Sequence, residues 1–142
     1  RRRVVRAKPV GLGLAIVALA AAMGVGLGLR GDAKIAVIHD RNPVAVRLSD
    51  GRTRNGYTVR LYNKADNERS FRLAVSGLTD AAIEVVGHDA AVSVASDATR
   101  ELRVLVSSAE GEKRSIAFVA TDLASGWAVT AQDMFIPSEG GR

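Results

Sequence analysis

The sequence predicts an all-β, immunoglobulin-like antiparallel sandwich of about seven strands, preceded by one transmembrane α-helix. After residue 30, apolar and polar residues alternate with a period of two in several short segments, separated by turns about every 8 to 12 residues. No helical period persists in that part of the chain for as long as about ten residues. Before it, residues 9–29 form an uncharged run of about 21 mostly apolar residues.

These patterns divide the chain into five parts. We expect a basic flank at residues 1–8, a transmembrane helix at residues 9–29 and a linker or first short strand at residues 30–38. The sandwich is expected at residues 39–137 and a frayed tail at residues 138–142. The sequence begins with Arg instead of Met. We therefore expect a fragment or a processed product of a longer protein.

The positive charge of the chain is confined to its beginning. The net charge is +5, but residues 1–30 contain six basic and no acidic residues, so that residues 31–142 carry a net charge of −1. A nucleic-acid-binding module would show a basic face, and the sandwich shows none. The chain also has no cysteine, which excludes disulfides, thiolate metal sites and a cysteine nucleophile within it.

The apolar run at residues 9–29 is long enough to cross the hydrocarbon core of a bilayer as a helix. By the positive-inside rule its basic flank stays in the cytoplasm, which places the sandwich in the periplasm of a bacterium, anchored to the inner membrane. Small residues at Ala20, Gly24 and Gly28 share one helix face and would allow another membrane helix to approach.

A cleaved signal peptide is the alternative interpretation of this segment, with a passable cleavage site at residues 31–33. Two details favour the anchor. The apolar run is longer than the 7 to 15 residues usual for the core of a signal peptide, and the chain lacks an initiating Met.

Residues 39–64 predict the first hairpin of the sandwich. One buried face is expected to hold Val44, Val46, Leu48, Val59 and Leu61. Between the two strands lie Asp50-Gly51 and Asn55-Gly56, which are pairs that readily reverse a chain. Pro43 precedes the first of these strands and favours an edge position for it.

The remaining strands follow the same two-residue period. Their predicted inward residues are Phe71, Leu73, Val75, Ile83, Val85, Leu102, Val104, Val106, Ile116 and Phe118. We expect the strands at residues 69–76, 82–86, 91–95 (a short edge piece), 99–107, 115–121 and 127–136, the last of which ends at Pro137.

No catalytic or metal-binding residue is assigned. A Ser-His-Asp catalyst would need His39 or His88, but each lies in a predicted loop beside an Asp, and the chain has no G-x-S-x-G motif. His39, His88 and Met134 are ligand types that suit copper, although their spacing matches no ligand pattern. Aromatic side chains could form a contact surface or fill the core: Tyr57, Tyr62 and Trp127.

A family resemblance is carried by three short segments: Asp40 to Pro43 (DRNP), Leu48 to Gly51 (LSDG) and Arg54 to Val59 (RNGYTV). The ending Asp133 to Pro137 also matches, and Ser70 to Leu73 matches more loosely. The chain resembles the C-terminal region of the FixG/CcoG/RdxA family of accessory proteins for assembly of cbb3-type cytochrome c oxidase. The resemblance extends from the apolar segment to the last strand.

The resemblance implies a polytopic membrane protein whose cytoplasmic part carries two [4Fe–4S] clusters, and which reduces copper before its delivery to the oxidase. The cluster-binding cysteines have no counterpart here, so we expect no cofactor in this part and no enzymatic activity of its own. Its expected role is periplasmic docking of oxidase subunits or copper chaperones. Two alternatives remain: copper binding by the domain itself at His39, His88 and Met134, and a generic interaction module of the cell envelope.

Overall fold

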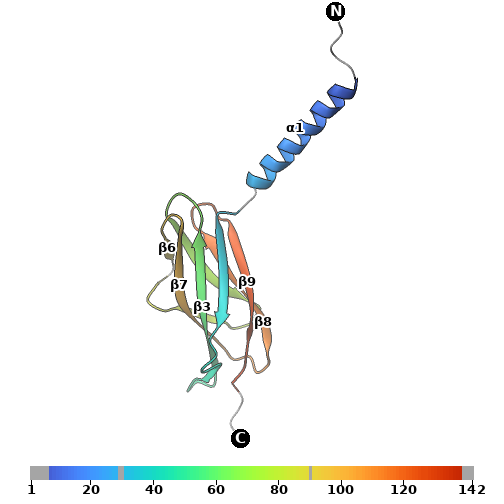
Figure 1. Ribbon diagram of the computed structural model, residues 1–142. Helices are drawn as coiled ribbons and strands as arrows, with labels where there is room; N and C mark the ends of the chain where they lie inside the picture. Colours follow the sequence, from blue (N-terminus) through green and yellow to red (C-terminus); the bar gives the residue numbers. More distant parts are fainter. Residues whose placement is uncertain (1–6, 29–30, 90, 139–142) are drawn as a thin grey trace, which may run out of the picture. The chain divides into compact units, whose positions relative to one another are not determined.

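Two antiparallel β-sheets pack face to face in this computed structural model, which describes residues 7–28, 31–89 and 91–138 (Figure 1). The first sheet has the order β1-β3-β7-β5, and a short strand, β2, also pairs with β3. Its strands are β1 (Ala33–His39), β2 (Val46–Arg47), β3 (Thr53–Asn63), β5 (Ala82–Val85) and β7 (Ala98–Ser108). The second sheet has the order β6-β4-β8-β9. Its strands are β4 (Arg69–Ser76), β6 (Val92–Val94), β8 (Arg114–Asp122) and β9 (Ala128–Phe135).

The core lies between the two sheets and consists of the inward half of each strand. Tyr57, Phe71, Phe118 and Phe135 are its largest members, and each is at most 1% exposed. Smaller apolar side chains complete it: Val59, Leu61, Leu73, Val92, Val94, Leu102, Val104, Val106, Ile116 and Ala120. Nine of these fourteen positions are predicted from the alternation in the sequence, because successive strand residues face opposite sides of a sheet. Val92, Val94, Ala120 and Phe135 are core residues that the prediction does not include. The predicted immunoglobulin-like antiparallel sandwich is therefore confirmed.

The described residues form nine strands, where the sequence predicts about seven. The difference lies at the beginning of the domain. Residues 30–38 are predicted to be a linker or a short strand, but β1 pairs with β3 along its whole length, from Ala33 opposite Asn63 to His39 opposite Tyr57. The strand segments predicted after residue 68 are all present, within two residues at each end.

The predicted hairpin at residues 39–64 is wrong in two details. Val44 and Val46 are exposed, because the short β2 pairs only at the edge of the sheet beside Thr53 and Arg54. Asn55 and Gly56 do not form a turn but lie inside β3, where Asn55 is fully buried. The other predicted pair, Asp50-Gly51, is confirmed as the turn, and Gly51 has a φ of 86°. The predicted edge position after Pro43 is confirmed.

Gly77 ends β4 with a φ of 101°, a conformation that residues with a Cβ atom rarely adopt. A Cβ atom at this position would lie 2.6 Å from the backbone carbonyl oxygen of Ser115 and 3.2 Å from the Cα atom of Ile116. Since both neighbours belong to β8, the absence of a side chain lets the end of β4 pass close to the adjacent strand.

The described residues before the sandwich include one helix, α1 (Ala7–Gly28), and residues 1–31 and residues 32–142 are two separate units. Pro9 lies in the first turn, where its missing N–H group costs no helical hydrogen bond. In the described parts of the chain, no helix is long and apolar enough to cross a membrane. A helix is thus confirmed over the predicted segment, whereas a membrane span is not. Leu29, most of the predicted basic flank and most of the predicted tail lie outside the described residues.

The turn between β8 and β9 is organised by the carboxylate of Asp122, which is 1% exposed. Its oxygens accept hydrogen bonds from the backbone N–H of Ala124 (2.9 Å) and the hydroxyl of Ser125 (2.7 Å), and it pairs with the guanidinium of Arg69. Burial acts to raise the pKa of Asp122, but these hydrogen bonds and the charge of Arg69 outweigh it and hold the pKa below its usual range. The turn therefore depends on an ionised Asp122.

Replacing Asp122 by Asn should make the free energy of unfolding less dependent on pH under acidic conditions. Because the pKa of Asp122 is lower in the folded than in the unfolded chain, its ionisation stabilises the fold above the unfolded-state pKa of about 3.9 and ceases to do so as the pH falls further. We expect the free energy of unfolding to fall less between pH 6 and pH 3 in Asp122→Asn than in the unchanged protein, measured by urea titration. Parallel profiles would contradict this assignment.

Candidate functional site

The structure does not bring together the three residues proposed as copper ligands. His39 ends β1 and His88 follows β5, so the two lie at opposite edges of one sheet, three strand spacings or about 14 Å apart across the strands. Met134 lies in β9, in the other sheet. Among the described residues there is also no group of three or more His, Cys, Asp or Glu side chains that could hold a metal ion.

His39 lies at the seam where β1 meets β9. Its Nε2 atom is 3.2 Å from the carbonyl oxygen of Val44, and its Nδ1 atom is 3.8 Å from the carboxylate of Asp133. Its ring packs against Tyr57 with 4.6 Å between centroids. Asp133, and not Met134, faces His39 because alternation along β9 turns Asp133 inward with Phe135. His39 is therefore a half-buried residue of the seam, and not the solvated loop residue that the sequence predicts.

His88, by contrast, stays at the surface of the first sheet. Its Nδ1 atom is 3.2 Å from the carbonyl oxygen of Val86, and its Nε2 atom is 3.0 Å from the guanidinium of Arg100 on β7. A guanidinium is always a donor, so this contact occupies the lone pair of Nε2 that a metal would need. The sequence-based prediction of a loop histidine is confirmed here.

Three side chains of β3 bind residues 134–138, at the end of β9 and just beyond it. Thr53, Asn55 and Tyr57 occupy every second position of β3, so they face the same side of the sheet. The Nδ2 atom of Asn55 donates to the carbonyl oxygen of Ile136 (2.8 Å), and its Oδ1 atom accepts from the N–H of the same residue (2.9 Å). We name these three residues the inter-sheet clamp.

The other two members of the inter-sheet clamp act on either side of Asn55. The hydroxyl of Tyr57 donates to the carbonyl oxygen of Met134 (3.0 Å), and the hydroxyl of Thr53 lies 3.0 Å from that of Ser138. Burial, together with the nearby Asp133, raises the pKa of Tyr57 far above its usual range. Tyr57 thus acts as a protonated hydrogen-bond donor with a structural role. Of the two predicted roles, core filling is confirmed for Tyr57, which is fully buried.

Of the other two aromatic candidates, Trp127 is 44% exposed and Tyr62 lies half-buried on β3. They do not join Tyr57 in one contact surface, because Tyr57 faces the core and Tyr62, five positions along the same strand, faces the opposite side of the sheet.

The DRNP segment is fixed by contacts of its Asp. The N–H of Asp40 donates to the carbonyl oxygen of Gly56 (2.9 Å), and its carboxylate pairs with the guanidinium of Arg103 (3.0 Å). Thr58 donates to the same carboxylate at 3.4 Å. Gly56 makes room for this arrangement, since a Cβ atom there would lie 2.6 Å from the Asp40 carboxylate. Asp40, Gly56 and Thr58, which belong to the segments that carry the family resemblance, therefore have structural roles.

This contact predicts that Gly56→Ala and Asp40→Ala do not act independently. In the unchanged background the new methyl group displaces the Asp40 carboxylate, which should cost about 1 kcal/mol of unfolding free energy. In the Asp40→Ala background nothing remains to be displaced, so the same substitution should cost markedly less. A double-mutant cycle by urea denaturation measures this coupling, and additive effects would contradict the contact.

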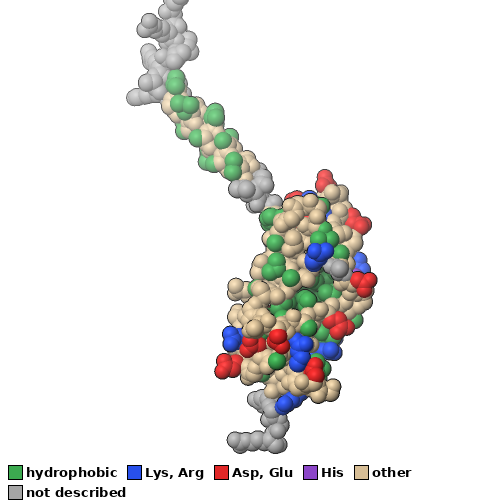
Figure 2. Space-filling model, turned by 180° about the vertical axis from the view of Figure 1, so that it is seen from behind, with side chains coloured by type: hydrophobic (Ala, Val, Ile, Leu, Met, Phe, Trp, Pro, Cys, Tyr) green, Lys and Arg blue, Asp and Glu red, His purple; other side chains and the backbone are tan. Residues whose placement is uncertain are grey.

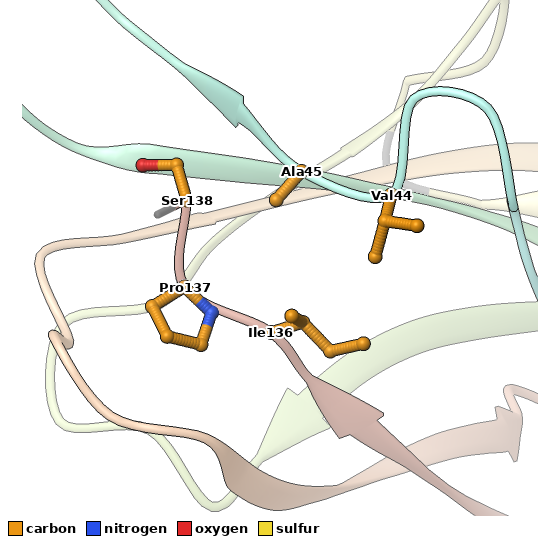
Figure 3. Close-up of a pocket in the computed structure, with 5 residues that line it drawn as sticks. All are labelled: Val44, Ala45, Ile136, Pro137 and Ser138. Carbon is orange, nitrogen blue, oxygen red and sulfur yellow. The ribbon is translucent and has the colours of Figure 1, made fainter. Parts of the chain in front are cut away.

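Beyond the clamp, the surface is hollowed in two adjacent places that the sequence does not reveal. One hollow of about 380 Å³ is lined by Val44, Ala45, Ile136, Pro137 and Ser138, whose side chains surround it (Figure 3). A second, of about 290 Å³, shares Pro137 and Ser138. The first is mainly apolar, and its one hydroxyl, that of Ser138, is bonded to Thr53. It has the size of a small ligand pocket but lacks the converging polar groups that orient a substrate.

Comparison with known proteins identifies the family of the chain. Residues 23–138 match the family described as "IG-like fold at C-terminal of FixG, putative oxidoreductase". This chain belongs to the FixG family. The predicted resemblance is thereby confirmed, and the chain represents the immunoglobulin-like C-terminal domain of that family.

Individual members of the FixG family show how much of the protein this domain represents. The chain is 36% identical over 132 residues to protein RdxB of Cereibacter sphaeroides, a match that covers 88% of this chain and 26% of RdxB. It is 43% identical over 54 residues to the nitrogen fixation protein FixG of Rhizobium meliloti, covering 38% of this chain and 10% of that protein. The chain thus spans about a quarter of the length of RdxB.

A solved structure of a FixG-related protein from Vibrio parahaemolyticus has the same fold. It superposes with a TM-score of 0.67 at 22% identity, covering 77% of this chain and 99% of the solved chain. At this identity the likeness concerns the fold alone. It agrees with the two-sheet arrangement described above for the FixG domain.

Proposed function

We propose that this FixG domain is a periplasmic docking module, anchored in the bacterial inner membrane, of a longer iron–sulfur protein that serves assembly of cbb3-type cytochrome c oxidase. The observation that carries the proposal is the match of residues 23–138 to the C-terminal domain of FixG. Because the chain spans only 26% of RdxB, the remaining three quarters of such a protein would carry the redox chemistry.

The arrangement of the described side chains supports docking more than catalysis. The histidines are held by a backbone carbonyl and a guanidinium, Tyr57 is locked as a donor, and the hollow beside Val44 and Ile136 is apolar. A rigid sandwich with an apolar hollow at one end can receive a side chain of a partner protein. Oxidase subunits or copper chaperones are the partners that we propose.

Anchoring is proposed from the sequence of residues 9–29 and its flank. The run is uncharged, six basic residues surround it, and the apolar side chains of α1 are exposed. Such exposure costs free energy in water and none in lipid. The basic residues that precede the run favour a cytoplasmic beginning, and therefore a periplasmic sandwich. Two [4Fe–4S] clusters would lie in the cytoplasmic part that precedes this chain.

The proposal is tested in a bacterium whose full-length gene is replaced by one lacking residues 32–142. We expect the activity and the copper content of the cbb3-type oxidase to fall, while the electron paramagnetic resonance signal of the iron–sulfur clusters in the truncated protein persists. An unchanged oxidase would contradict docking. Finding no cysteine-rich ferredoxin motif upstream of residue 1 would contradict the wider assignment.

A further inference from the structure

We propose that the β8–β9 turn, residues 122–127, rests on the lipid surface next to the anchor and fixes how the domain stands on the membrane. The inference rests on the anchoring proposed above. It concerns Leu123 and Trp127, two large apolar side chains that are 45% and 44% exposed at the tip of this turn.

The turn lies at the end of the sandwich where the chain enters it. Arg69 links Asp122, the first residue of the turn, to Asp32, the first residue of the domain, through its two terminal nitrogens. The N–H of Leu123 also donates to the carbonyl oxygen of Ser70, next to Arg69. Both ends of this network belong to the sandwich, so the position of the turn beside Asp32 does not depend on where α1 lies.

The length of the connecting chain sets how far this end can be from the membrane. Only residues 29–31 separate α1 from Asp32, and a fully extended chain advances about 3.5 Å per residue. Asp32 is therefore within about 14 Å of the last residue of the helix. If that helix is anchored, the β8–β9 turn is within reach of the lipid headgroup region, where Trp is enriched in membrane proteins.

The turn is built so that contact with lipid would leave few polar groups without partners. Besides the bond of Leu123 to Ser70, the N–H of Ala124 is bonded to the Asp122 carboxylate, that of Gly126 to the Asp122 carbonyl, and that of Trp127 to the Ser125 hydroxyl. Residues 123–127 carry no charge. Since unpaired N–H groups are costly in an apolar medium, this internal pairing lowers the cost of the contact.

The charges around the turn identify the kind of lipid surface. The neighbouring loops and strand ends contain the acidic residues Asp66, Glu68 and Asp97 and the basic residues Lys34, Lys64 and Arg100. This mixture is not a basic patch that would attract anionic lipids, so we propose an apolar contact with the interfacial region of a zwitterionic bilayer. Adding anionic lipid should therefore not strengthen it.

Trp127 is the only tryptophan of the chain, so its fluorescence reports on the turn without labelling. The 142-residue chain is reconstituted into phosphatidylcholine liposomes that contain lipids spin-labelled either near the headgroup or deep in the acyl chain. We expect blue-shifted emission and stronger quenching by the shallow label than by the deep one. The same quenching should persist when phosphatidylglycerol is added.

The matched control moves the tryptophan to the other end of the sandwich. In the double variant Trp127→Phe with Val44→Trp, the indole replaces an exposed side chain beyond the far end of β1, about 20 Å along the strand from Ala33. We expect emission as in water and no quenching by either label. Circular dichroism confirms that both proteins keep the sheet fold.

Flotation of the liposomes at alkaline pH separates the two proposals. If the chain floats with the liposomes but Trp127 is no better quenched than Trp in the control variant, the inference about the turn is wrong and the anchor stands. If the chain does not float, both the anchor and the inference are wrong. Quenching that requires anionic lipid would also contradict the apolar contact argued above.

Discussion

Replacing Gly77 by Ala is expected to lower the free energy of unfolding by about 3 kcal/mol or more. The new Cβ atom would lie 2.6 Å from the carbonyl oxygen of Ser115, and the φ of 101° is unfavourable for alanine in itself. A backbone oxygen of β8 cannot rotate away as a side chain could, so β4 and β8 must separate. Urea titration followed by circular dichroism measures the effect.

Gly87 offers the matched control for this substitution. Its φ is 78°, but a Cβ atom there would meet no heavy atom within 4 Å. Gly87→Ala should therefore cost only the backbone strain, about 1–2 kcal/mol. Equal losses at both positions would show that the close approach to Ser115 contributes nothing.

Replacing Asn55 by Ala is expected to cost about 3–4 kcal/mol of unfolding free energy. The substitution removes two hydrogen bonds to Ile136 and leaves the N–H and the carbonyl group of that residue without their partner in a partly buried place. It also opens a small cavity between the sheets. Thermal or urea denaturation measures the loss.

Two other asparagine variants test the mechanism behind this loss. Asn67→Ala changes an exposed side chain and should cost less than about 0.5 kcal/mol. Asn55→Asp keeps the acceptor for the N–H of Ile136 but loses the donor to its carbonyl oxygen and adds a buried charge. A stability of Asn55→Asp equal to that of the unchanged protein would contradict the role of the clamp.

The sequence predicts the sandwich well because its strongest signal is local. Leu102, Val104 and Val106 alternate with polar residues, and the alternation alone indicates which side of β7 is buried. The same holds for Phe71 and Leu73 in β4. A resemblance carried by the DRNP and RNGYTV segments identifies the family, which the match of residues 23–138 confirms.

Contacts between residues far apart in the chain could not be predicted from local sequence patterns. Asn55-Gly56 has the composition of a turn, but the pair lies inside β3. There Asn55 binds Ile136, which lies 81 residues later in the chain. Gly56 lies against Asp40, 16 residues earlier. His39 is drawn into the seam by Asp133, again from the far end of the chain. The hollow beside Val44 requires β2 and the end of β9 to meet, and no local pattern indicates that.

The inter-sheet clamp also determines how the domain responds to its chemical surroundings. Antibody domains join their two sheets by a disulfide, whereas here Thr53, Asn55 and Tyr57 join them by hydrogen bonds, in a chain without cysteine. Such a link needs no oxidant to form and cannot be broken by a reductant or captured by a thiol-seeking metal. In the electron-transferring protein that we propose, such a link would be unaffected by the redox reaction, and the stability of the domain should be the same with and without dithiothreitol.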